Sequence, residues 1–146
     1  MTKILFLCHG NICRSPMAEY VMKDLAKTEQ DIYIESKAVS AEEIGNPIYP
    51  SAARTLKSHN IPFGNHRARQ IKKDDYEKFD YIIVMEEYNL PRLFRIIGAD
   101  PESKVYKLLD FTPTPGDIED PWYSGNFEKV FEEITLGCKG LLDKIK

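Results

Sequence analysis

The sequence predicts an α/β fold in which helices cover both faces of a twisted parallel sheet. Strand-like and helix-like segments alternate along the chain, which is the order of βαβ units. The length of 146 residues suits one domain, and 42% apolar with 29% charged residues is typical of a globular protein. We therefore expect residues 1–146 to form a single domain.

Two strands and two helices are expected in the first half of the chain. Thr2–Leu7 is a run of apolar or β-favouring residues that ends at a loop, and Asp31–Lys37 alternates apolar with polar residues, so both are predicted to be strands. Ser15 and Pro16 predict a helix start, with Ser15 as the N-cap and Pro16 at the first helical position. Ser51–His59 has apolar residues at helical spacing and is predicted to be a second helix.

The next part of the chain predicts two further strands. Lys73–Phe79 is a polar helical segment that leads into the strand Asp80–Met85. Tyr88–Ile97 is helix-like, although Pro91 indicates that its first turn starts late. Val105–Leu109 is predicted to be the fourth strand.

A loop and a long helix are expected at the end of the chain. Phe111–Gly125 contains three prolines and two glycines, so we expect an ordered loop. Phe127–Ile145 has apolar residues at helical spacing and predicts a closing helix, which Gly137 and Gly140 weaken.

Composition and cysteine content argue against several classes of protein. Twenty basic and 23 acidic residues give a net charge of −3, which argues against nucleic-acid binding through bulk charge. The longest apolar runs, Ile4–Cys8 and Tyr81–Met85, are too short to span a bilayer. Cys8, Cys13 and Cys138 are sparse and odd in number, which does not fit a secreted disulfide framework, so we expect a cytoplasmic protein.

The loop after the first predicted strand carries residues suited to phosphate chemistry. Ligands of open parallel sheets bind beyond the carboxyl ends of the strands. Cys8 stands at such an end, six positions before Arg14 and the start of a helix. Backbone N–H groups, the helix N-terminus and the Arg14 fork can together hold a tetrahedral dianion. The same positive field is expected to favour the thiolate of Cys8, which is the nucleophilic form.

Other residues of this loop fit the same purpose. Gly10 permits backbone angles that a side chain would forbid. Asn11 tolerates a left-handed conformation and can hydrogen-bond to hold the loop open. Ser15 can donate a hydrogen bond to the Cys8 sulfur and ease its later departure.

A nucleophile of this kind needs an acid that protonates the leaving group. Glu119 and Asp120 are the candidates, in a loop that contains proline. The segment Asp120-Pro121-Trp122-Tyr123 combines a carboxylate, a rigid residue and two aromatic side chains. Because aromatic walls suit a flat ring beside the phosphate, this segment is expected to face the substrate.

Taken together, these motifs resemble the low-molecular-weight protein tyrosine phosphatases. The resemblance extends from Ile4 to the closing helix, which is nearly the whole chain, and its first and last segments are the most specific. It is carried by Cys8–Pro16, Gly45–Pro47, His66 with Ala68–Gln70, Phe79–Met85 and Asp120–Tyr123.

The resemblance implies a four-stranded parallel sheet flanked by helices and hydrolysis through a cysteinyl-phosphate, without a metal or cofactor. By match, Cys8 is the nucleophile, Arg14 binds phosphate, and Asp120 acts first as acid and then as base. The positions that hold the loop by hydrogen bonds are matched by Asn11, Ser15, Ser36 and His66. The residues expected to bind substrate are His9, Gly10, Asn11, Ile12, Cys13, Glu42, Trp122 and Tyr123.

Three positions depart from the pattern of the family. His9 occupies a pocket-wall position that is usually apolar, and Glu42 lies where many members place an aromatic residue. Trp122 stands where many members carry tyrosine. The chemistry is therefore better predicted than the substrate preference.

Two cysteines and one histidine have competing interpretations. Cys13 is either a small buried residue or a redox partner that traps oxidised Cys8 as a disulfide, and the resemblance supports the second. Cys138 on the closing helix is expected in the core. Without the resemblance, His66 would be interpreted as a satisfied surface or loop histidine.

The predicted activity is hydrolysis of phosphotyrosine in proteins or of small aryl phosphates, with a monomer expected and neither nucleic acid nor membrane as partner. One alternative is an arsenate reductase on the same scaffold, which needs further thiols to resolve its intermediate. No cysteine lies between Cys13 and Cys138, and Asp120 is present, which disfavours that reaction. A second alternative is a non-catalytic module that binds phosphate.

Overall fold

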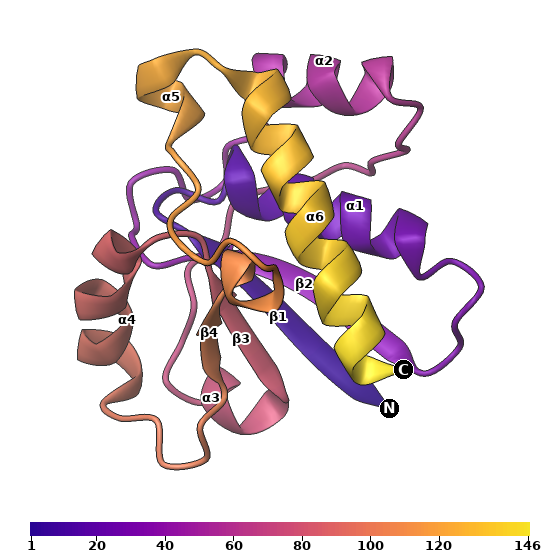
Figure 1. Ribbon diagram of the computed structural model, residues 1–146. Coiled ribbons are helices and arrows are strands. Elements are labelled where there is room, and N and C mark those ends of the chain that lie inside the picture. Colours follow the sequence, from indigo (N-terminus) through magenta and orange to yellow (C-terminus); the bar gives the residue numbers. More distant parts are fainter.

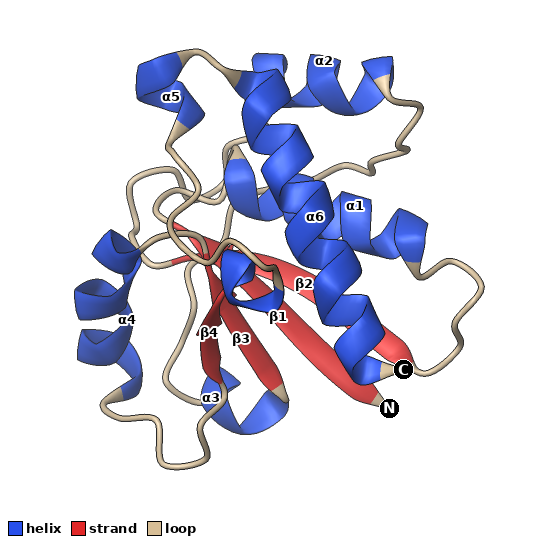
Figure 2. Cartoon of the chain, viewed as in Figure 1, coloured by secondary structure: helices blue, strands red, loops and turns tan.

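The computed structural model describes residues 1–146 and confirms the predicted α/β class (Figures 1 and 2). The chain forms one parallel sheet with the strand order β2-β1-β3-β4, and helices lie on both of its faces. The strands are β1 (Thr2–Cys8), β2 (Ile32–Ala38), β3 (Tyr81–Val84) and β4 (Val105–Lys107).

Six helices and two 3₁₀ turns connect and cover these strands. The α-helices are α1 (Arg14–Leu25), α2 (Pro50–Ser58), α3 (Asp75–Lys78), α4 (Leu90–Ile97), α5 (Pro121–Ser124) and α6 (Phe127–Ile145). The 3₁₀ turns are η1 (Glu87–Asn89) and η2 (Leu108–Phe111). No helix is long and apolar enough to cross a membrane.

In the second half of the chain, the structure corrects the predicted elements in two places. The fourth strand is shorter than expected because the chain turns into η2 after Lys107. The segment predicted to be a loop contains α5, since Asp120 caps it by accepting from the Trp122 N–H and Pro121 supplies the fixed φ of a first helical residue.

The central strand β1 anchors both helical layers. Its alternate side chains point to opposite faces. Ile4, Phe6 and Cys8 join the cluster with α1 and α6, whereas Leu5 and Leu7 join the cluster with α4. All five are at most 3% exposed. Because each large apolar side chain contributes about 1.5–3 kcal/mol when buried, this strand fixes the position of its own carboxyl end, where Cys8 lies.

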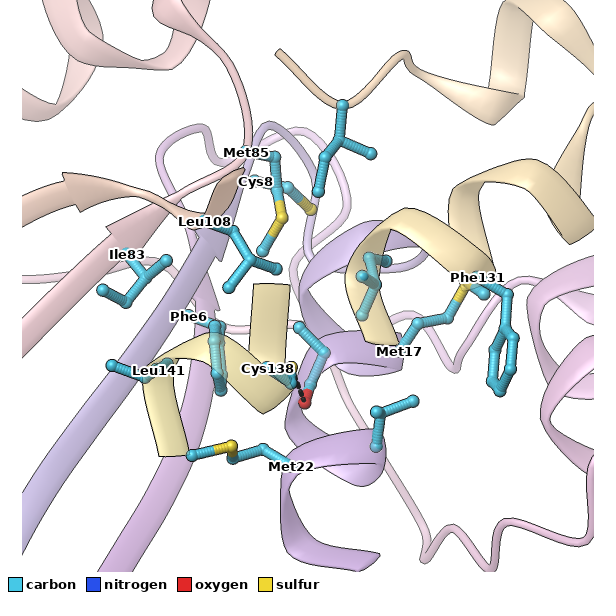
Figure 3. Close-up of a cluster of buried hydrophobic side chains, with 14 of the residues drawn as sticks. Phe6, Cys8, Met17, Met22, Ile83, Met85, Leu108, Phe131, Cys138 and Leu141 are labelled. Atoms are coloured by element: carbon cyan, nitrogen blue, oxygen red, sulfur yellow. Dashed lines mark hydrogen bonds between the residues drawn. The ribbon is translucent and has the colours of Figure 1, made fainter. Parts of the chain in front are cut away.

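Sulfur atoms are prominent in the larger cluster. Figure 3 shows Met85 beside Cys8 and Cys138 beside α1, where its Sγ donates to the Ala18 carbonyl at 3.8 Å. Cys138 is completely buried, so the prediction of a core role is confirmed.

The closing helix α6 lies across α1 and packs closely on η2 (Figure 1). A Cβ atom at Gly137 would lie 2.4 Å from Leu108 Cγ, and one at Gly140 would lie 1.9 Å from the Phe111 carbonyl oxygen. These glycines each cost the helix about 1 kcal/mol in propensity. They are nevertheless required, because only residues without a side chain let α6 approach η2 so closely.

Candidate active site

The carboxyl end of β1 places a thiol among backbone N–H groups. The chain turns sharply after Cys8, and Asn11 adopts a left-handed φ of 62°. As a result, the N–H groups of Asn11 and Ser15 point at Cys8 Sγ, at 3.3 and 3.4 Å. N–H donors aimed at a sulfur atom stabilise its thiolate. The loop thus directs backbone N–H groups at the thiol, and α1 begins directly after it.

The start of α1 differs from the sequence prediction. Cys13, rather than Ser15, occupies the N-cap position, and no side chain caps the helix. Ser15 lies inside the first turn, and its hydroxyl is 3.1 Å from Cys8 Sγ. The hydroxyl is thus drawn into the site by tertiary contacts and is not available to cap the helix.

A chain of buried hydrogen bonds leads from Cys8 to a carboxylate that the sequence analysis missed. Asn11 Nδ2 donates to Ser15 Oγ at 2.7 Å and to Ser36 Oγ at 3.0 Å. Ser36 Oγ in turn donates to Glu19 Oε1 at 2.6 Å. Since both Nδ2 hydrogens are used as donors, Ser15 accepts from Asn11. Its own hydrogen can then point at Cys8 Sγ, 3.1 Å away, or at the Lys37 carbonyl, 3.5 Å away.

The amide of Asn11 is held in this orientation from its other side. The side-chain Oδ1 accepts from the Arg69 backbone N–H at 3.2 Å. The backbone carbonyl oxygen of Asn11 lies 2.7 Å from His66 Nε2. His66 is 8% exposed. Burial lowers the pKa of His66, against the effect of its bond to the Asn11 carbonyl. A neutral ring with its proton on Nε2 therefore supports the loop.

Arg14 lies at the bottom of the site and is 2% exposed. Its Nη1 donates to Glu86 and, at 2.8 Å, to the carbonyl of Ile118. Burial opposes the charge of Arg14, but the negative charges nearby, that of Cys8 first and then that of Glu86, outweigh it, so its pKa is raised. The guanidinium is thus a fixed cation beside the thiol.

Asp120 faces the same space from the loop before α5. One carboxylate oxygen lies 3.5 Å from Arg14 Nη2, and the other accepts from the Trp122 N–H at 3.0 Å. Glu119, the second candidate acid, points elsewhere and pairs with Lys129 at 2.7 Å. Hydrogen bonds from Lys129 hold the pKa of Glu119 below its ordinary value. The geometry therefore favours Asp120.

These elements enclose a cavity of about 190 Å³. The residues that line it are Cys8, His9, Gly10, Ile12, Cys13, Arg14, Glu42, Glu43, Asp120, Trp122 and Tyr123. All predicted substrate-binding residues except Asn11 are among them. Asn11 is fully buried and supports the loop from below, together with Ser36 and His66.

Aromatic and acidic side chains form the mouth of the cavity. Trp122 packs on Tyr49 with ring centroids 4.9 Å apart, whereas Tyr123 is 86% exposed. His9 and Glu42 also line the cavity, and His9 Nε2 lies 2.7 Å from a Glu42 carboxylate oxygen. The departures from the family pattern at His9 and Glu42 thus form one interacting pair.

Cys13 lines the cavity as a free thiol that is 6% exposed. Burial raises its pKa, and the negative charge of Cys8 adds to the effect. Cys13 is thereby kept protonated, unlike a nucleophile. No group of three or more potential metal-binding side chains is present.

Four contributors escaped sequence reasoning: Glu19, Glu86, Glu43 and the carbonyl of Ile118. Glu86 follows the strand beside β1, so the rule that parallel strands end at the same edge could have indicated it. Glu19 lies one turn after Ser15, and its pairing with Lys23 at 2.6 Å is an i,i+4 signal visible in the sequence. No sequence pattern near Ile118 indicates that its carbonyl accepts a hydrogen bond from Arg14.

The site combines a thiol surrounded by N–H groups, a buried arginine and a carboxylate near that arginine, all at one edge of a parallel sheet. This combination defines the class of cysteine-dependent phosphatases. Residues 3–146 match the family model of low molecular weight phosphotyrosine protein phosphatases. The chain belongs to this family.

Individual relatives are similar to this chain over nearly its full length. The low molecular weight protein-tyrosine-phosphatase YfkJ of Bacillus subtilis is 39% identical, covering 100% of this chain and 97% of its own, and the Gallus gallus phosphatase is 42% identical over 97% and 94%. The YfkJ crystal structure has a TM-score of 0.94, covering 99% and 94%. The structure of the Streptococcus pyogenes enzyme has a TM-score of 0.90 at 36% identity, covering 100% and 94%.

Proposed function

We propose that the protein is a phosphotyrosine protein phosphatase that hydrolyses aryl phosphate monoesters through a cysteinyl-phosphate. The observation that carries this proposal is the convergence of Cys8 Sγ, the Arg14 guanidinium and the Asp120 carboxyl on one cavity. The names of the curated relatives, which are protein-tyrosine-phosphatases, support the same reaction.

In the first step, the N–H groups around Cys8 and the Arg14 fork hold the phosphate dianion. The Cys8 thiolate attacks phosphorus, so an S–P bond forms as the bond from phosphorus to the aryl oxygen breaks. The leaving phenol has a pKa of about 10 and departs poorly as an anion at neutral pH. Asp120, protonated at this stage, gives its proton to that oxygen.

In the second step, water attacks the cysteinyl-phosphate. The Asp120 carboxylate takes a proton from this water, and the S–P bond breaks to release inorganic phosphate. The Ser15 hydroxyl, 3.1 Å from Cys8 Sγ, supports the departing thiolate by donating to it.

Residues 1–146 form the single domain that carries out this reaction. We place it in the cytoplasm as a monomer, acting on tyrosine-phosphorylated proteins or small aryl phosphates, with no nucleic-acid partner and no membrane insertion. Its odd number of cysteines, all free, supports a reducing compartment. Cys13 serves there as the partner that traps oxidised Cys8 before irreversible oxidation.

Two assays on the purified protein test the reaction. Phosphate release from phosphotyrosine and para-nitrophenyl phosphate is measured with a chelator present, and arsenate reduction is measured separately with thiols. We expect hydrolysis in the first assay and no reduction in the second. Arsenate reduction without hydrolysis would make the protein a reductase, and phosphate binding without either reaction would make it a binding module.

A further inference from the structure

One side of the cavity mouth is acidic. Glu42 and Glu43 lie in the segment after β2 and line the same cavity as Cys8. The Glu42 side chain is 62% exposed, so its charge is available to a bound molecule. Glu43 is half-buried and accepts from Asn46 Nδ2 at 2.8 Å.

Both carboxylates are held by the loop that carries the nucleophile. His9 Nε2 lies 2.7 Å from Glu42 and, since a carboxylate only accepts, donates to it. Glu43 packs over Gly10, where an added Cβ would lie 3.1 Å from Glu43 Cγ. These contacts hold both acidic side chains beside the loop that carries Cys8.

No exposed lysine or arginine lines the cavity to balance the charges of Glu42 and Glu43. Arg14 is its only lysine or arginine, and it is buried at the bottom and paired with Glu86. The cavity is also lined by the exposed rings of Trp122 and Tyr123. Carboxylates and aromatic faces are the groups that bind guanidinium and ammonium side chains.

We propose that Glu42 and Glu43 select phosphotyrosine substrates that carry lysine or arginine next to the phosphorylated residue. This inference rests on the proposed function. Once the dianion is bound at Arg14, the peptide leaves the cavity past its mouth, where a flanking basic side chain meets the two carboxylates. A flanking acidic side chain meets the same charges and is repelled.

The test uses three phosphopeptides that differ only beside the phosphotyrosine: arginine, alanine or glutamate on both sides. An exposed ion pair contributes about 0.2–1 kcal/mol, which is up to about fivefold per carboxylate. We therefore expect kcat/KM to fall about three- to tenfold from the arginine to the alanine peptide, and to fall again for the glutamate peptide. The preference should shrink at 1 M salt, where the screening length is about 3 Å.

The double variant Glu42→Gln, Glu43→Gln should bring the three kcat/KM values to within about twofold of one another. A matched control is Glu128→Gln, because Glu128 also pairs with a histidine, His59 at 2.9 Å, but lies outside the cavity. This control should keep the wild-type preference.

Two outcomes overturn the inference alone: equal kcat/KM for the three peptides in the wild type, or a preference that survives in the double variant. Absence of hydrolysis of every peptide and of free phosphotyrosine overturns the proposed function, and this inference with it.

Discussion

The floor and the rim of the active-site cavity are built in opposite ways. The floor consists of Cys8 and Arg14, which line the cavity, together with Asn11 and Ser15, which support Cys8 by hydrogen bonds; all four are at most 3% exposed. Their side chains hydrogen-bond to one another or to buried groups such as the Ser36 hydroxyl and the Ile118 carbonyl. Because a buried polar group without a partner costs about 1–3 kcal/mol, each floor residue constrains the next.

The rim consists of Glu42, Trp122 and Tyr123, which are more than half exposed, and of Glu43, which is half-buried. A change at the rim leaves few buried groups unsatisfied. The reaction therefore depends on the floor, whereas the choice of substrate is open to change at the rim.

The largest expected effect is at the floor. Cys8→Ser should abolish turnover, because the hydroxyl is a far weaker nucleophile than the thiolate, yet it should retain binding of phosphate esters, since the N–H groups and Arg14 remain. Turnover and binding of phenyl phosphate are measured by phosphate release and calorimetry. Cys138→Ser, a buried cysteine outside the cavity, is the control and should stay active. Substantial hydrolysis by Cys8→Ser would exclude the covalent route.

Asp120 bridges floor and rim, and its loss should be nearly as severe. Asp120→Ala should slow cleavage of tyrosine phosphate by about 10²–10⁴-fold, with substrate binding largely intact. The burst phase should recover with para-nitrophenyl phosphate, whose phenolate departs unaided. Glu119→Ala, in the same loop but paired with Lys129, should keep the wild-type burst. An equal burst deficit for both esters would show that Asp120 is not the acid.

Arg14→Lys tests whether the floor needs a shape as well as a charge. A lysine supplies one point charge and cannot bridge two phosphate oxygens. We expect losses of about 10–100-fold in both phosphate affinity and kcat/KM, as for a lost charge-assisted hydrogen bond. The control is Arg69→Lys, whose side chain is 56% exposed. Wild-type kinetics in Arg14→Lys would contradict the phosphate-binding role.

A smaller effect is expected at the rim. Trp122→Ala removes an aromatic side chain that packs on Tyr49 and lines the cavity. It should raise KM for aryl phosphates about two- to tenfold and leave the burst rate nearly unchanged. A drop in the burst rate as large as that of Asp120→Ala would mean that Trp122 instead positions the acid.

The smallest effect concerns stability and pH. Burial lowers the pKa of His66 below that of the unfolded chain. As pH falls below about 6.5, the unfolded state takes up a proton that the folded state resists, so the free energy of unfolding decreases. Urea unfolding between pH 7.5 and pH 5 should show a weaker pH dependence for His66→Gln than for the wild type. Equal dependence would mean that His66 accepts its proton in the folded state.

Sequence reasoning predicted the fold class and most of the cavity lining because the information is local. Cys8 to Arg14 are contiguous, and the alternation of strands and helices fixes where their loop lies. It failed where a tertiary contact decides. Ser15 does not cap α1 since Cys8 and Asn11 engage its hydroxyl.

The glycines of α6 are a second instance of the same limit. Their low helix propensity argued against a continuous helix, and only the distance between α6 and η2 explains why Gly137 and Gly140 are needed. Glu86 is likewise invisible until β3 is placed beside β1. Long-range packing, rather than a local motif, explains both the glycines of α6 and the position of Glu86.

The contacts of Arg14 affect how the chain folds to its active form. Its bond to the Ile118 carbonyl joins residues 104 positions apart, and its pair with Glu86 spans 72 positions. Contacts between such distant residues require the closure of long loops, which slows folding. Recovery of catalytic activity during refolding therefore reports the completion of these distant contacts and comes no earlier than the joining of β3 to β1.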